Sequence, residues 1–107
     1  MNNFKLLGLA SIVFFLTNSC FADEYTVGQK NKAFSVKKLT IKVGDVVKFE
    51  NDDPFFHNVY SLSDTKTFDL GSYPKGESKS VIFNKPGTIA VECAIHPKMY
   101  MEVIVKE

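Results

Sequence analysis

The stretch of the sequence that decides the fold is Cys93-Ala94-Ile95-His96-Pro97-Lys98-Met99, close to the C-terminal end of the chain. It carries a thiol, an imidazole and a thioether at the spacing C-x2-H-x2-M. The only other histidine, His57, lies 36 residues before Cys93. A short loop can present three of these side chains, but only a separate strand can bring the distant imidazole to them. A tertiary fold therefore has to assemble the group.

These four side chains form a donor set with a definite chemical preference. Thiolate and thioether groups favour Cu(I), and imidazole also suits Cu(II), so a His2Cys group with a weak axial Met is typical of blue-copper electron-transfer sites. We therefore expect one copper ion per chain, alternating between Cu(I) and Cu(II). Zinc is the main alternative metal, but a methionine does not favour it, and structural zinc sites use more Cys and His ligands than this sequence offers.

The chain has 107 residues, of which 45% are hydrophobic and none is Trp, and this size indicates one small globular domain. No helical periodicity persists over ten residues. Short runs that alternate apolar and polar residues are instead separated by turn residues. The strand candidates are 25–27, 33–36, 39–43, 46–50, 55–60, 80–83, 88–93 and 101–105.

About seven or eight short strands predict an all-β fold, a two-sheet sandwich with Greek-key connections. Within the expected strands, Val47 and Phe49 share one face, and Ile89, Val91 and Cys93 share another. We expect those faces to point into the core. The middle stretch, 61–80, is polar and contains turn residues, and it is predicted to form loops or short edge strands.

Residues 1–22 are predicted to be a secretory signal peptide, and residues 23–107 the domain. A lysine at position 5 precedes an apolar run over 6–16 that is too short to span a bilayer, and a polar segment ends at Ala22, where we expect cleavage. The mature chain would be exported to the periplasm and not inserted in the membrane. A lipid anchor on Cys20 is an alternative, although Thr17 stands where such signals usually have Leu.

Cleavage after Ala22 leaves 85 residues with Cys93 as the single cysteine, so no intrachain disulfide is possible. An unpaired thiol in an oxidising compartment is protected when it is buried or bound to a metal. The mature chain would hold 12 lysines and no arginine against 12 acidic residues. This neutral, Arg-free composition argues against nucleic acid as a partner. We expect a monomer.

The sequence resembles the cupredoxins, in particular the small plastocyanin, pseudoazurin and amicyanin type. The matching pieces are His57-Asn58-Val59, Gly87-Thr88 followed five residues later by Cys93, and the C-x2-H-x2-M loop; the similarity runs from about Leu39 to the C-terminus. The resemblance implies an eight-stranded β-sandwich with one copper that shuttles electrons between larger redox proteins. It also implies that the strong ligands are His57, Cys93 and His96, and that the axial ligand is Met99.

Two spacings compete for the axial position, because Met101 sits where the longer plastocyanin spacing would place it. In both family types the axial Met lies four residues before the first Val of the closing V-x-V. Here that pattern is Val103-Ile104-Val105, and counting back gives Met99. Met101 would then be a core residue or a lid over the site. Met99 is favoured, with Met101 as the alternative.

The sequence also departs from the family pattern around the expected ligands. Phe56 replaces the Pro that usually precedes the first His, and Glu92 replaces the aromatic residue that usually precedes the Cys. Ile89 stands where a strand Tyr is common. Ala94 removes the hydroxyl that usually bonds the Asn beside the first His, although Asn58 can still reach backbone groups. Because hydrogen bonds around the sulfur tune such sites, the reduction potential cannot be carried over from the family.

The function expected from these residues is that of an electron carrier, not of an enzyme, because four ligands leave no open coordination position. A copper carrier that delivers or buffers the metal is the alternative, since the same loop would serve it. The electron donor and acceptor are expected to be redox proteins. Docking is expected through an apolar rim of Phe55, Phe56 and Pro97 around the exposed edge of His96, rather than through long-range charge steering.

Overall fold

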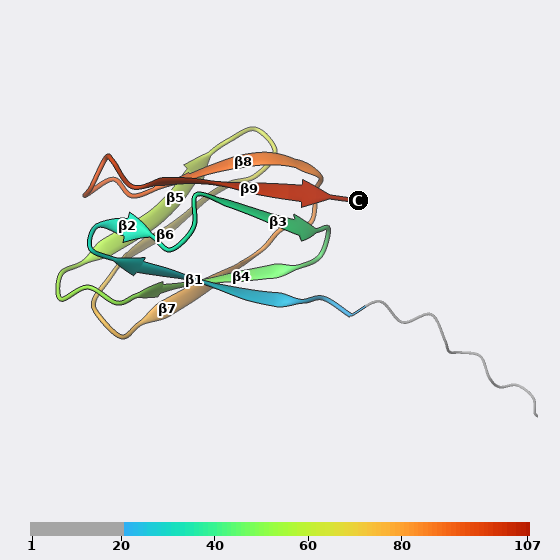
Figure 1. Ribbon diagram of the computed structural model, residues 1–107. Helices are drawn as coiled ribbons and strands as arrows, with labels where there is room; N and C mark the ends of the chain where they lie inside the picture. Colours follow the sequence, from blue (N-terminus) through green and yellow to red (C-terminus); the bar gives the residue numbers. More distant parts are fainter. Residues whose placement is uncertain (1–20) are drawn as a thin grey trace, which may run out of the picture.

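The computed structural model describes residues 21–107, and within them the chain forms nine strands and no helix (Figure 1). The prediction of an all-β sandwich is confirmed, with nine strands where seven or eight were expected. Since these residues include no helix, none of them forms one that is long and apolar enough to cross a membrane. The expected signal peptide, apart from its last two residues, and Cys20 lie outside the described residues.

The first sheet has four strands in the order β2-β1-β4-β7. Its strands are β1 (Glu24–Lys30), β2 (Ala33–Phe34), β4 (Val46–Asn51) and β7 (Ser78–Ile82). β1 runs parallel to β4 over six paired residues, and β7 pairs with the other side of β4 in antiparallel fashion. β1 is therefore longer than the three residues expected, because it pairs with the whole length of β4.

The second sheet has five strands in the order β3-β9-β8-β5-β6. Its strands are β3 (Lys38–Lys42), β5 (His57–Leu62), β6 (Thr67–Tyr73), β8 (Gly87–Glu92) and β9 (Tyr100–Lys106). The chain passes from one sheet to the other between β2 and β3, β3 and β4, β4 and β5, β6 and β7, and β7 and β8. Such repeated changes of sheet are typical of Greek-key sandwiches.

The middle stretch, 61–80, contains β6 and the start of β7, and these are edge strands of the two sheets. β6 is seven residues long, because Phe68 and Leu70 alternate with exposed residues and pack against the core. The expectation of edge strands is confirmed, and β6 is longer than the polar composition suggested.

The core lies between the two sheets, where the period-two pattern places one face of each strand. Val47 and Phe49 are both 0% exposed, and Ile89, Val91 and Cys93 follow the same rule on β8 and just beyond it. The predicted inward faces are thus confirmed. Burial of such side chains is the main source of stability in a sandwich of this size.

Candidate metal centre

The strand register explains why His57 and the loop after β8 meet. β5 and β8 are antiparallel neighbours, with Tyr60 opposite Glu92. Moving backwards along β5 therefore corresponds to moving forwards beyond β8. His57 at the first position of β5 and Cys93 just after β8 consequently lie at the same end of the sheet.

The structure brings three of the four predicted ligands together. The Sγ atom of Cys93 lies 3.7 Å from Nδ1 of His57 and 3.8 Å from Nδ1 of His96, and the two Nδ1 atoms are 3.1 Å apart. Among the described residues, these three form the group of potential ligands close enough to hold one metal ion. These three residues are the ones that the sequence analysis proposed as strong ligands, and the facing ring atoms are known only from the structure.

The three donor atoms fit a transition-metal ion in size. A point equidistant from them lies about 2.1 Å from each, as the three separations require. Metal–nitrogen bonds to imidazole are about 2.0–2.1 Å, and metal–thiolate bonds are about 2.3 Å for zinc, a neighbouring first-row metal. The three donor atoms therefore leave room for one ion between them.

His57 is held by a hydrogen bond on the side of its ring that faces away from Cys93. Its Nε2 atom is 2.7 Å from Oδ2 of Asp53, and the His57 ring is 0% exposed. A carboxylate accepts hydrogen bonds and donates none, so Nε2 carries the proton and donates it. Nδ1, the other ring nitrogen of His57, faces Cys93 and His96, and in the neutral ring it offers the lone pair that a metal ligand requires.

Asn58 ties the two ligand segments together despite the missing hydroxyl at Ala94. Its Oδ1 atom accepts a hydrogen bond of 2.7 Å from the backbone N–H of Ala94. The expectation that Asn58 reaches a backbone group is therefore confirmed. The strand that carries His57 is thus joined to the loop that carries Cys93 by a contact that needs no side chain at position 94.

Both candidate axial residues are buried, but they occupy different kinds of position. Met101 is 0% exposed within β9, opposite Val91 of β8. Met99 is 1% exposed in the ligand loop, and its backbone N–H donates to the carbonyl of His96 at 2.9 Å. Both residues belong to the buried hydrophobic core, so burial does not distinguish them. The assignment of Met99 as the axial ligand remains a prediction.

Aromatic and apolar side chains surround the outer edge of the centre. The Phe55 ring lies 5.4 Å from the His57 ring and 5.2 Å from the His96 ring, between centroids. Phe55 is 36% and Phe56 54% exposed. His96, unlike His57, is only partly buried. Its pKa lies below the usual range because of desolvation, and the nearby His57 and Lys32 act in the same direction.

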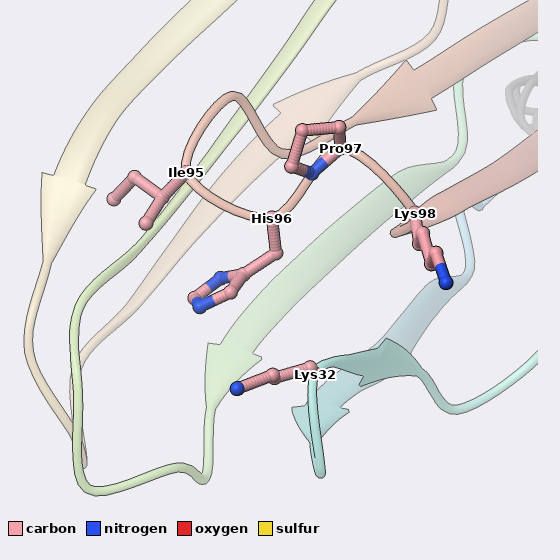
Figure 2. A pocket seen from close by; sticks show the side chains of 5 residues that line it. All are labelled: Lys32, Ile95, His96, Pro97 and Lys98. Carbon is pink, nitrogen blue, oxygen red and sulfur yellow. The ribbon is translucent and has the colours of Figure 1, made fainter.

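An open pocket adjoins this edge, and His96 points into it (Figure 2). Ile95, Pro97 and Lys98 line it from the ligand loop, and Lys32 reaches it from the turn between β1 and β2. Ile95 is 48% exposed. Pro97 was expected at this edge from the sequence, whereas Ile95 and Lys32 were not.

Asp53 is the main residue of this site that the sequence analysis missed. It lies in Asn51-Asp52-Asp53-Pro54, which reads as a simple end to a strand. It is only 3% exposed, and besides His57 it binds two backbone N–H groups more than 20 residues away. The one available signal was its position four residues before the candidate ligand.

A Greek-key sandwich with a buried Cys and two His at one end defines a class of metal-binding β proteins. The comparisons with known proteins then show the family. Residues 22–106 match the copper binding proteins of the plastocyanin/azurin family, and the chain belongs to that family. The resemblance to cupredoxins is confirmed, and copper is the metal that the centre binds, one ion per chain.

One curated relative and two solved structures illustrate the similarity. The methylamine utilization protein MauL of Methylorubrum extorquens is 31% identical over 96 residues, which cover 86% of this chain and 84% of MauL. The Cu(I) form of an amicyanin variant is 26% identical with a TM-score of 0.73, over 80% of this chain and 86% of amicyanin.

The Cu-containing nitrite reductase from Thermus scotoductus is 27% identical, also with a TM-score of 0.73. That match covers 90% of this chain, but this chain spans only 25% of the reductase. The similarity to the reductase is thus confined to a part of that enzyme the size of one sandwich.

Proposed function

We propose that this protein is a type 1 blue-copper electron carrier, with His57, Cys93 and His96 as strong ligands and Met99 as the weak axial ligand. The observation that supports this most directly is the triangle of Cys93 Sγ and the two Nδ1 atoms, all within 3.8 Å of one another. Bound copper would supply a one-electron couple between Cu(I) and Cu(II).

The protein's own contribution is to hold the donor atoms in one arrangement for both oxidation states. His57 is fixed by Asp53, and the Cys93 loop is fixed by the hydrogen bond from the Ala94 N–H to Asn58. Donor atoms that are fixed before the electron arrives have little distance to move when it does. This favours rapid transfer over catalysis, and we propose that the chain is not an enzyme.

Electrons would enter and leave through the partly exposed edge of His96. Phe55, Ile95 and Pro97 form the apolar part of its surroundings, and Lys32 and Lys98 line the same pocket. A small apolar rim suits brief contacts with larger redox proteins, since transient redox encounters use small interfaces. The donor and acceptor are proposed to be periplasmic, with this chain exported as a monomer after cleavage following Ala22.

The test is to load the purified mature chain with Cu(II), record its visible spectrum and titrate its redox state. We expect an intense blue band from thiolate-to-copper charge transfer and a reversible one-electron couple. Cys93→Ser should abolish the band without unfolding the sandwich, because Cys93 makes no disulfide. A colourless or irreversible copper complex of the wild-type protein would instead favour a copper carrier that delivers or buffers the metal.

A further inference from the structure

Asp53 connects the N-terminal hairpin to the metal centre. Its Oδ1 atom accepts a hydrogen bond from the backbone N–H of Asn31 at 2.8 Å, and Oδ2 accepts one from the N–H of Lys32 at 3.0 Å. Oδ2 also accepts the 2.7 Å hydrogen bond from Nε2 of His57. One buried carboxylate thus joins a turn in the first sheet to a ring at the start of β5 in the second.

The turn that holds Asp53 has an uncommon backbone conformation. Asn31 and Lys32 have φ angles of 56° and 57°, and they link β1 and β2 as a two-residue hairpin loop. Positive φ at both positions is typical of a type I′ turn. This conformation directs two successive N–H groups to one side, where they form a small concave site for an anion. In this protein the anion is a side chain of the same chain.

The backbone of Asp53 is fixed as well. Its N–H donates to Oδ1 of Asn51 at 2.8 Å, and the Asn51 amide donates to the carbonyls of Phe55 and Tyr73, both at 2.9 Å. Asn51 is 0% exposed. The carboxylate is therefore constrained from the turn and from its own loop, and it has little freedom to release His57.

Both oxygens of the Asp53 carboxyl act as acceptors, because Oδ1 faces one N–H group and Oδ2 faces two. Three donors directed at one carboxyl group favour its ionised form. An anion that accepts the Nε2 proton increases the basicity of the imidazole and fixes the orientation of the ring.

We propose that Asp53, clamped by the Asn31–Lys32 turn, is a positioning residue for His57 that stabilises Cu(II) relative to Cu(I). The inference rests on the copper centre proposed above. It assigns the N-terminal hairpin a part in setting the reduction potential, because its amides hold the carboxylate in place. The preference for Cu(II) follows from charge, because a nearby negative group favours the more positive metal ion.

The experiment compares Asp53→Asn with a matched control, Asp45→Asn, in the copper-loaded protein. Asp45 is also buried and also accepts two backbone hydrogen bonds, from Asp23 and Lys42, both at 2.9 Å. It lies in the β3–β4 connection, at the opposite end of the sandwich from the β1–β2 turn, and contacts no histidine (Figure 1). Both substitutions keep the side-chain shape and remove one negative charge.

We expect Asp53→Asn to weaken Cu(II) binding about tenfold more than Cu(I) binding, at the lower end of the usual effect of such outer residues. For a one-electron couple that change raises the reduction potential by about 59 mV. Asp45→Asn should lower the stability of the fold but leave the potential unchanged. A blue, reversible wild-type protein whose Asp53→Asn potential matches that of Asp45→Asn would overturn this inference and leave the proposed function intact.

A second measurement needs no variant, and it tests the hydrogen bond between His57 and Asp53 even if Asp53→Asn does not fold. In the NMR spectrum of the Cu(I)-loaded wild-type protein, the Nε2 proton of His57 should be visible at low field and exchange slowly with water. Rapid exchange of that proton would refute the contact with Asp53. A wild-type protein that gives no blue copper complex would overturn the proposed function and this inference together.

Discussion

Tyr73 offers a sharp test of how buried polar groups stabilise this sandwich. Its ring is 1% exposed, its hydroxyl donates to the carbonyl of Phe49 at 2.9 Å, and it accepts a 3.1 Å hydrogen bond from Nε2 of Gln29. Gln29 is 0% exposed, and its Oε1 atom has no hydrogen-bond partner. The Tyr73 hydroxyl is therefore the one partner of the Gln29 side chain.

Tyr73→Phe removes this hydroxyl and leaves the whole Gln29 amide unpaired in the core. A buried polar group without a partner costs about 1–3 kcal/mol, and the lost hydrogen bond to Phe49 adds about 1 kcal/mol. We expect the free energy of unfolding to fall by about 2–4 kcal/mol at pH 7. That is a large share of the roughly 5–15 kcal/mol typical of a domain. Urea unfolding of the metal-free protein measures it.

The same substitution should change how stability depends on alkaline pH. Burial raises the pKa of Tyr73 to about 12, with the hydrogen bond from Gln29 opposing the rise and the charge of Cys93 adding to it. In the unfolded chain a tyrosine has a pKa of about 10. Between pH 10 and 12 the unfolded chain therefore releases a proton that the folded protein keeps. Stability is unaffected below pH 10 and falls by about 2–3 kcal/mol by pH 12.

Tyr73→Phe should lack this alkaline loss, so the two proteins should approach each other in stability as the pH rises. Tyr100→Phe is the control, because Tyr100 is 48% exposed and its hydroxyl bonds only the surface carboxylate of Glu102. The control should change stability by less than about 0.5 kcal/mol at pH 7. A Tyr73→Phe protein within about 1 kcal/mol of wild type, or with the wild-type alkaline slope, would refute this account of the Gln29–Tyr73 pair.

Three further predictions concern the centre and the hairpin. Met99→Leu should raise the reduction potential while copper stays bound, and Met101→Leu should leave the potential unchanged; cyclic voltammetry of both tests this, and the reverse result would make Met101 the axial ligand. Asn58→Ala should lower the free energy of unfolding by about 1 kcal/mol, through loss of the hydrogen bond from the Ala94 N–H, in urea unfolding of the metal-free protein. Lys32→Gly should raise the free energy of unfolding by up to about 1 kcal/mol, because Asn-Gly suits a type I′ turn better than Asn-Lys. An unchanged or lower free energy of unfolding would show that the Lys32 side chain compensates for its strained backbone.

The grouping of His57, Cys93 and His96 could be predicted, because residue types and short spacings in the sequence indicate it. Thiol, thioether and imidazole at C-x2-H-x2-M have few common uses together, and strand parity already placed Cys93 on an inward face. The fold followed from the same kind of local signal, the period-two alternation of β4, β8 and β9. β6 was less clear because Asp69, Gly71 and Ser72 obscure its alternation, and its pairing with β5 is irregular between Asn58 and Tyr60.

The contacts that Asp53 and Tyr73 make could not be predicted, because they join residues that no local sequence pattern relates. Asp53 meets Asn31 and Lys32 across 22 and 21 residues, and Tyr73 meets Gln29 across 44. Each of these contacts has one partner in the N-terminal hairpin. That hairpin lies before Leu39, outside the stretch in which the sequence alone resembles the cupredoxins.

The ligands and the groups that position them lie in different parts of the chain. The ligands define what the centre binds, and they lie in the part of the chain that resembles other copper proteins. His57 is held by Asp53, and Asp53 is held in turn by the backbone amides of Asn31 and Lys32. Through these amides the hairpin takes part in the proposed balance between Cu(II) and Cu(I). A side chain in the hairpin can change without altering those amides, whereas a different turn length would remove them. The reduction potential should therefore respond to an insertion between β1 and β2 more strongly than to the replacement of either turn side chain.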